Sequence, residues 1–153
     1  MSFSELGSNF PDHCLVRKCQ RDGCGLLLNP KSINKILDLD HVVLNLANHT
    51  RCDFLIFTKK NKRVYVVPVE LKSGGVSNAK GVVDQLQGGV EQANRWLEKG
   101  VDFDLIPILA HGKGLHKDIW NKFRRLKVNF RGRKEKVVLR KCGSKLSEVM
   151  TNK

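Results

Sequence analysis

The fold is decided by residues 53–72, which read DFLIFTKKNKRVYVVPVELK. This stretch starts with an apolar and aromatic run (53–57) and ends with a run rich in β-branched residues (63–72), and polar residues separate the two. Two runs of high strand propensity around a short polar segment predict a β-hairpin. With the turn centred on Asn61 and Lys62, antiparallel partners have residue numbers that sum to 123.

Three ionisable residues fall at the open end of this hairpin. Because 53 and 70 sum to 123, Asp53 and Glu70 are predicted to face each other with Cβ atoms ~4.5–5.5 Å apart. Lys72 points to the same side, since alternate side chains of a strand share a face. Two facing carboxylates repel unless a cation lies between them, and oxygen ligands suit Mg²⁺ or Mn²⁺. The lysine adds a fixed positive charge suited to orienting a water molecule.

The same three charges could instead form a solvated cluster on an exposed sheet face. The neighbouring residues favour a site. Val64, Val66 and Pro68 share the face of Glu70, so the charges lie at the end of an apolar stripe that a fold would bury.

The rest of the chain predicts an α/β order of elements. Apolar residues at helical spacing after the break at 73–75 predict an amphipathic helix over 81–99, ending at Gly100. Residues 103–110 predict a strand, and the helical crossover makes it a parallel neighbour of strand 63–72. We also expect a strand or helix within 32–46, a helix over 117–126, and a basic strand pair at 127–130 and 136–140. Together these indicate a mixed central β-sheet flanked by helices, with residues 1–153 as a single domain.

Three short motifs lie in the hairpin and the helix after it: RCDFLIF at 51–57, VPVELKSG at 67–74 and DQL at 84–86. Together they resemble the motifs of the PD-(D/E)XK nuclease superfamily, the restriction-endonuclease-like and RecB-like fold. The resemblance covers roughly residues 51–110. It implies a restriction-endonuclease-like core. It also implies an endonuclease or exonuclease that hydrolyses phosphodiester bonds, with DNA as the favoured substrate, and leaves a 5′-phosphate and a 3′-hydroxyl.

The resemblance also implies roles for individual residues. Asp53 and Glu70 resemble the ligands of Mg²⁺ or Mn²⁺, with the main-chain carbonyl of Leu71 as a further ligand. Lys72 resembles the catalytic lysine near the attacking water. Gln85 resembles the helix glutamine that supports the active site in some of these families.

The chain departs from the family pattern at two places. Directly before Asp53, Cys52 stands where the family often has a proline. Near the N-terminus, no helix carries an obvious extra metal-binding glutamate, because Glu5 is the only glutamate before Glu70. Gln92 lies one heptad after Gln85 on nearly the same helix flank, and Gln85 is the favoured site residue.

The net charge of +13 is concentrated at one end of the chain. Residues 1–112 hold 14 basic and 12 acidic residues (+2), whereas residues 113–153, the basic C-terminal segment, hold 14 and 3 (+11). Clusters that neutralise phosphates gain free energy from counterion release, so we expect this segment to bind nucleic acid. The predicted contacts are Lys113, Lys117, Lys122, Arg124, Arg125, Arg131, Arg133 and Lys134.

A function of a different class stays open. The chain could be a non-catalytic nucleic-acid-binding module whose carboxylates and lysine are only a surface charge network. Aromatic residues are sparse at 7%, and the helical spacing of Trp120 and Phe123 predicts core positions rather than base-stacking positions. An enzyme that cuts both strands of a duplex would favour a homodimer.

The five cysteines make an odd set with no secretory signal, so we expect reduced thiols and a cytoplasmic protein. Cys14, Cys19, Cys24 and Cys142 could form a zinc or iron–sulfur site, but their spacing is unlike that of a zinc finger. Buried thiols are the favoured interpretation. No apolar run approaches the ~18 residues of a membrane span, so we expect no membrane partner.

Overall fold

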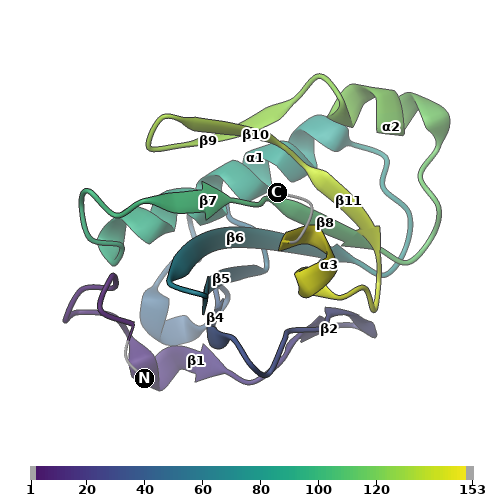
Figure 1. Cartoon of the computed structure of the whole chain (residues 1–153). Coiled ribbons are helices and arrows are strands. Elements are labelled where there is room, and N and C mark those ends of the chain that lie inside the picture. The colour runs from purple at the N-terminus through teal and green to yellow at the C-terminus, as the bar shows by residue number, and fades with distance from the viewer. Residues whose placement is uncertain (1–2, 151–153) are drawn as a thin grey trace.

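The computed structural model describes residues 3–150, and within them seven strands form one mixed sheet (Figure 1). The strand order is β1-β4-β5-β6-β8-β11, with β7 also paired to β6. The strands are β1 (Leu15–Val16), β4 (Ile33–Asp38), β5 (Phe54–Lys60), β6 (Arg63–Lys72), β7 (Phe103–Leu105), β8 (Ile108–His111) and β11 (Val138–Lys141). Pairing is antiparallel from β1 to β6 and parallel from β6 to β11. The predicted α/β class with a mixed central sheet is confirmed.

The β5–β6 hairpin has the predicted register. Its pairs run from Lys60 opposite Arg63 to Phe54 opposite Val69, so every pair sums to 123. Asn61 and Lys62 have φ angles of 53° and 67°. A two-residue turn with positive φ at both positions is the turn type whose twist matches that of paired strands. The register therefore follows from the turn.

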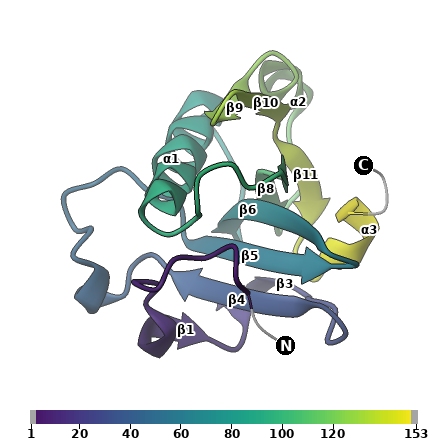
Figure 2. The same cartoon turned by 60° about the vertical axis from the view of Figure 1, so that its left-hand side comes forward.

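Apolar side chains cover both faces of the sheet. On one face, Val82, Leu86 and Val90 of α1 (Ala79–Glu91) pack with strand residues such as Phe57 and Val66. On the other face, α3 (Leu146–Met150) and the hairpin of β2 (Cys19–Arg21) and β3 (Cys24–Leu26) enclose a second cluster. Figure 2 shows α1 and α3 on opposite sides of the sheet. Both faces of β6 are buried, which explains its nearly continuous apolar sequence.

Three predicted elements differ from the structure. The strand expected at 103–110 is split into β7 and β8 at Pro107, which has no N–H for a strand pair; both halves are parallel to β6, as predicted. The predicted helix over 81–99 ends at Glu91 and continues only as a 3₁₀ turn, η3 (Gln92–Arg95). The helix predicted over 117–126 is α2 (Lys117–Phe123).

The predicted pairing of 127–130 with 136–140 is wrong. β9 (Lys127–Phe130) pairs with β10 (Arg133–Lys136), and residues 138–141 join the main sheet as β11. The cause is the turn at Arg131 and Gly132, whose φ angles are 47° and 81°. Such a turn closes a hairpin after two residues. Two further 3₁₀ turns are η1 (Asp12–Cys14) and η2 (Val42–Leu44).

The expectation of reduced cysteines is wrong for one pair. Cys24 and Cys142 form a disulfide, with Cα atoms 4.9 Å apart, whereas Cys14, Cys19 and Cys52 are free and buried. Cys14 lies in the core on the α1 side of the sheet, and Cys19 and Cys24 lie on the other side. The four cysteines considered as metal ligands therefore do not converge.

We predict that reduction destabilises the protein. The disulfide joins residues 118 apart in sequence, and crosslinks of this kind contribute ~2–5 kcal/mol by restricting the unfolded chain. Dithiothreitol should lower the free energy of unfolding, measured by urea denaturation. A Cys24→Ser/Cys142→Ser double variant should show the lower stability without reductant. Equal denaturation midpoints for the oxidised and reduced wild type would contradict the bond.

None of the helices within residues 3–150 has the length and apolar character needed to cross a bilayer.

Candidate active site

Two hydrogen bonds hold the Asp53 and Glu70 carboxylates at the open end of the β5–β6 hairpin. The Asp53 N–H donates to Glu70 Oε1 (3.1 Å), and the Leu71 N–H donates to Asp53 Oδ2 (2.8 Å). Each carboxylate thus uses one oxygen on the main chain of the opposite strand. The predicted juxtaposition of the two acids is present, and it follows from the hairpin register.

The second oxygen of each carboxylate lies beside a basic side chain. Lys72 Nζ is 3.1 Å from Glu70 Oε2, and Arg21 Nε is 3.2 Å from Asp53 Oδ1 without the geometry of a hydrogen bond. The Glu70 side chain is only 3% exposed and that of Asp53 17%. In this state the protein's own cations compensate two nearly buried acids.

Burial raises the pKa of the Glu70 carboxyl to about 7, and the negative charge of Asp53 adds to the increase. The hydrogen bond and positive charge of Lys72 act in the opposite direction. A proton is one way to relieve their repulsion and a divalent cation is another, so this donor set fits Mg²⁺ or Mn²⁺.

Arg21 is a site residue that the sequence did not reveal. It belongs to β2 and also pairs with Asp38 (2.9 Å) and Asp40 (3.2 Å), and its guanidinium stacks on Phe54 at 4.9 Å from the ring centroid. No local pattern marks a lone arginine 32 residues before its partner Asp53. Only the packing of the β2–β3 hairpin on the sheet brings it there.

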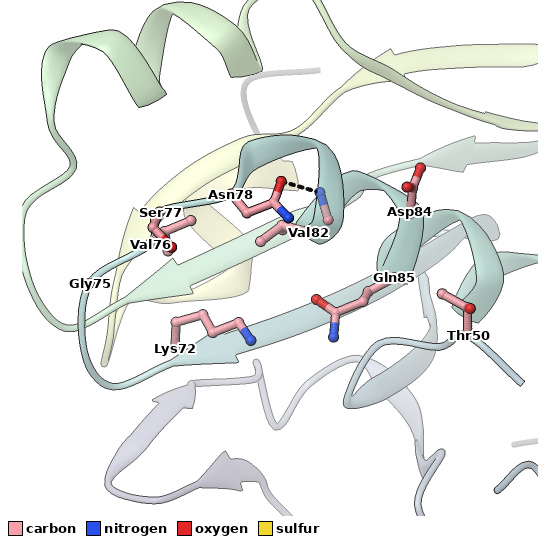
Figure 3. A pocket seen from close by; sticks show the side chains of 10 residues that line it. Thr50, Lys72, Gly75, Val76, Ser77, Asn78, Val82, Asp84 and Gln85 are labelled. Carbon is pink, nitrogen blue, oxygen red and sulfur yellow. Dashed lines mark hydrogen bonds between the residues drawn. The ribbon is translucent and has the colours of Figure 1, made fainter. Parts of the chain in front are cut away.

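Helix α1 places Gln85 beside the acids. Asn78 caps the helix by accepting a hydrogen bond from the Gly81 N–H (2.9 Å), drawn dashed in Figure 3. Two glycines then let the helix approach the segment before Asp53. A Cβ at Gly88 would lie 1.9 Å from the Thr50 carbonyl oxygen, and one at Gly89 2.1 Å from Cys52 Sγ. Any side chain at these positions would push the helix away.

Two adjoining clefts meet at Gln85. One, of about 420 Å³, is lined by Asp53, Glu70 and Gln85; the other, of about 550 Å³, is lined by Lys72 and Gln85. Figure 3 shows the ends of Lys72 and Gln85 in the second cleft. The alternative glutamine, Gln92, lines neither cleft and lies in η3. The geometry therefore favours Gln85, as the sequence did.

The predicted nucleic-acid contacts divide into two groups. Lys113, Lys117, Lys122, Arg124, Arg125 and Lys134 are exposed. Arg131 instead donates hydrogen bonds to Asn94 Oδ1 and to the Leu97 and Glu98 carbonyls, and Arg133 pairs with Asp102 at 2.7 Å. These two residues are also exposed, but their guanidinium groups already have partners within the chain.

Comparison of the chain with protein-family models, curated proteins and solved structures gave no match. Within residues 3–150, no group of three or more histidine, cysteine, aspartate or glutamate side chains is arranged to hold a metal ion. A metal at Asp53 and Glu70 would need a main-chain oxygen, such as that of Leu71, and water to complete its ligand shell.

We predict that Glu70 makes stability depend on pH. Because its folded-state pKa of about 7 exceeds the ordinary value of 4.5, the folded protein binds the proton more tightly than the unfolded chain between these values. The free energy of unfolding should therefore fall as pH rises from 4.5 to about 7, and then level off. The difference between wild type and Glu70→Gln, measured by denaturation across this range, isolates the effect. Parallel curves for the two proteins would contradict it.

Proposed function

We propose that this chain is a nuclease that uses Mg²⁺ or Mn²⁺ to hydrolyse phosphodiester bonds of nucleic acid, with DNA favoured, on a restriction-endonuclease-like core. One observation carries the proposal. The hairpin register forces two carboxylates together at the mouth of a cleft, beside a lysine two residues along the same strand. Burial and the charge of Asp53 raise the pKa of Glu70 even beside Lys72, so ionising this carboxyl in the fold costs free energy. Such a cost is typical of functional sites.

Asp53 and Glu70 would hold the metal, with the main-chain carbonyl of Leu71 as a further ligand. A bound divalent cation polarises the phosphoryl oxygen and makes a bound water more acidic. The chain's own groups do the remaining work. Lys72 Nζ lies 3.1 Å from Glu70 Oε2. The Lys72 ammonium group would orient the attacking water and stabilise negative charge on the phosphate. Gln85 offers both a donor and an acceptor to the same space.

The exposed part of the basic C-terminal segment would hold the substrate backbone near this cleft. The Gly112 N–H donates to the Lys72 carbonyl (2.8 Å), and a Cβ at Gly112 would lie 2.0 Å from the Ser73 carbonyl oxygen. This close contact places Lys113 next to the end of β6. A strand bound along Lys113 and α2 could then reach the carboxylates, with phosphate contacts supplying affinity rather than sequence selection.

We predict that cleavage requires both the metal and the three hairpin residues. Supercoiled plasmid, single-stranded DNA and RNA are incubated with Mg²⁺, Mn²⁺ or EDTA. Glu70→Gln and Asp53→Asn should abolish cleavage, because each removes a charged metal ligand. Lys72→Ala should lower kcat ~10²–10³-fold, the usual loss for one stabilising group. Gln85→Ala should cost ~10–100-fold, as a supporting contact does.

Two matched controls accompany these variants. Gln92→Ala changes the same residue type one heptad later, outside both clefts, and Glu91→Gln removes a carboxylate from the exposed surface of α1. Both should cleave like the wild type. A wild type that binds nucleic acid but cuts none of these substrates with either metal would refute the nuclease and favour the non-catalytic binding module.

A further inference from the structure

Helix α2 carries two aromatic residues with opposite environments. Phe123 is 1% exposed and packs in the core, as the helical spacing predicts. Trp120 is 46% exposed, so the prediction of a core position is wrong for this residue. Ile119 and Phe123 anchor the helix without it. Exposure of one aromatic ring is common in folded proteins, so what Trp120 can bind depends on the groups around it.

The exposed indole is paired with a cation. Arg124 Cζ lies 5.4 Å from the Trp120 ring centroid, one helical turn along the chain. The protein contains a second arginine–tryptophan pair, in which Arg95 Cζ lies 5.0 Å from the Trp96 ring. Trp96 is only 4% exposed and packs edge-on against Phe10. The pair at Trp96 is explained by packing, whereas the pair at Trp120 faces solvent.

The surroundings of Trp120 are strongly basic. Residues 113–127 hold six basic residues and one acid, Asp118. Lys117 and Arg124 lie on the Trp120 side of the helix, three residues before it and four after it. The exposed positive side chains here are Lys113, Lys117, Lys122, Arg124, Arg125 and Lys127. A ring among such charges suits a ligand that combines a flat π surface with phosphate groups.

This platform is connected to the candidate active site. The segment that leads into α2 is bonded to the end of β6 through the Gly112 N–H and the Lys72 carbonyl (2.8 Å). Helix α2 packs beside α1, near the end that receives the loop from β6 (Figure 1). A strand lying on α2 would therefore run toward Lys72.

We infer that Trp120 and Arg124 form a stacking platform for an unpaired base of single-stranded nucleic acid. The inference deepens the proposed function, because it assigns that nuclease a substrate with unpaired bases. A duplex keeps its bases stacked on one another and offers only its backbone to an exposed ring. A single strand can place a base on the indole while its phosphates contact the neighbouring lysines.

The platform can be tested by tryptophan fluorescence in EDTA, where binding is measured without cleavage. Trp96 is buried, so quenching by a ligand reports on Trp120. A single-stranded oligothymidine should quench the emission of the wild type, and Trp120→Phe should lose this signal. A fully paired blunt-ended DNA duplex, whose bases are stacked on one another, and inorganic polyphosphate, which has no bases, should bind with little quenching. Single-stranded RNA shows whether the platform accepts either sugar, and quenching by RNA also supports stacking.

Affinity measurements with variants separate the ring from the charge. Trp120→Ala should weaken oligothymidine binding by about 5- to 150-fold, the range for loss of one stacked base, and leave polyphosphate binding unchanged. Lys122→Ala should weaken both ligands alike and keep the quenching at saturation. Arg95→Ala removes the cation beside the buried Trp96 and should change the affinity for neither ligand. The platform would be overturned if Trp120→Ala bound oligothymidine as tightly as the wild type does. It would also be overturned if polyphosphate quenched the wild-type emission as strongly as oligothymidine does. These results do not depend on cleavage, so the platform and the nuclease can fail separately.

Discussion

The two-residue turn at Asn61 and Lys62 fixes the arrangement on which the rest of the structure depends. Its positive φ angles close the hairpin with Lys60 opposite Arg63, and the register then brings Glu70 within hydrogen-bond distance of the Asp53 main chain. A slip of one residue would move every side chain of one strand to the opposite face. It would send Glu70 away from Asp53 and α1, and it would exchange the β6 residues that pack in the two clusters on either side of the sheet.

The cost of this arrangement is the burial of the Glu70 carboxylate, to which repulsion from Asp53 adds. The fold distributes compensation over distant parts of the chain: main-chain N–H groups from each strand, Lys72 from β6, and Arg21 from a hairpin on the other side of the sheet. This compensation is incomplete, since the pKa of Glu70 remains raised. This incomplete compensation supports the proposal that a divalent cation binds between the two acids.

The hairpin, its register and the crossover helix could be predicted because local signals specify them: strand propensity, turn position and helical spacing. Helical spacing alone left Gln85 and Gln92 open, and the choice of Gln85 came from the family resemblance. The position of Arg21 and the Cys24–Cys142 disulfide depend on how the β2–β3 hairpin packs, and no short pattern encodes that packing. The partner of β9 was missed because the turn at Arg131 and Gly132 outweighs the apolar character of 137–139. The exposure of Trp120 was missed because helical spacing does not say which of two aromatic residues faces the core.

The most direct test of the central claim is a crystal of the wild type soaked in Mn²⁺ and measured for anomalous scattering. We predict one strong peak within coordination distance of both Asp53 and Glu70, with the ammonium group of Lys72 moved away from Glu70 Oε2, and no such peak in Glu70→Gln. The contrary result would be a crystal soaked in saturating Mn²⁺ that shows no anomalous peak between the two acids, with Lys72 and Arg21 still paired to them. That result would contradict the metal site and with it the proposed chemistry.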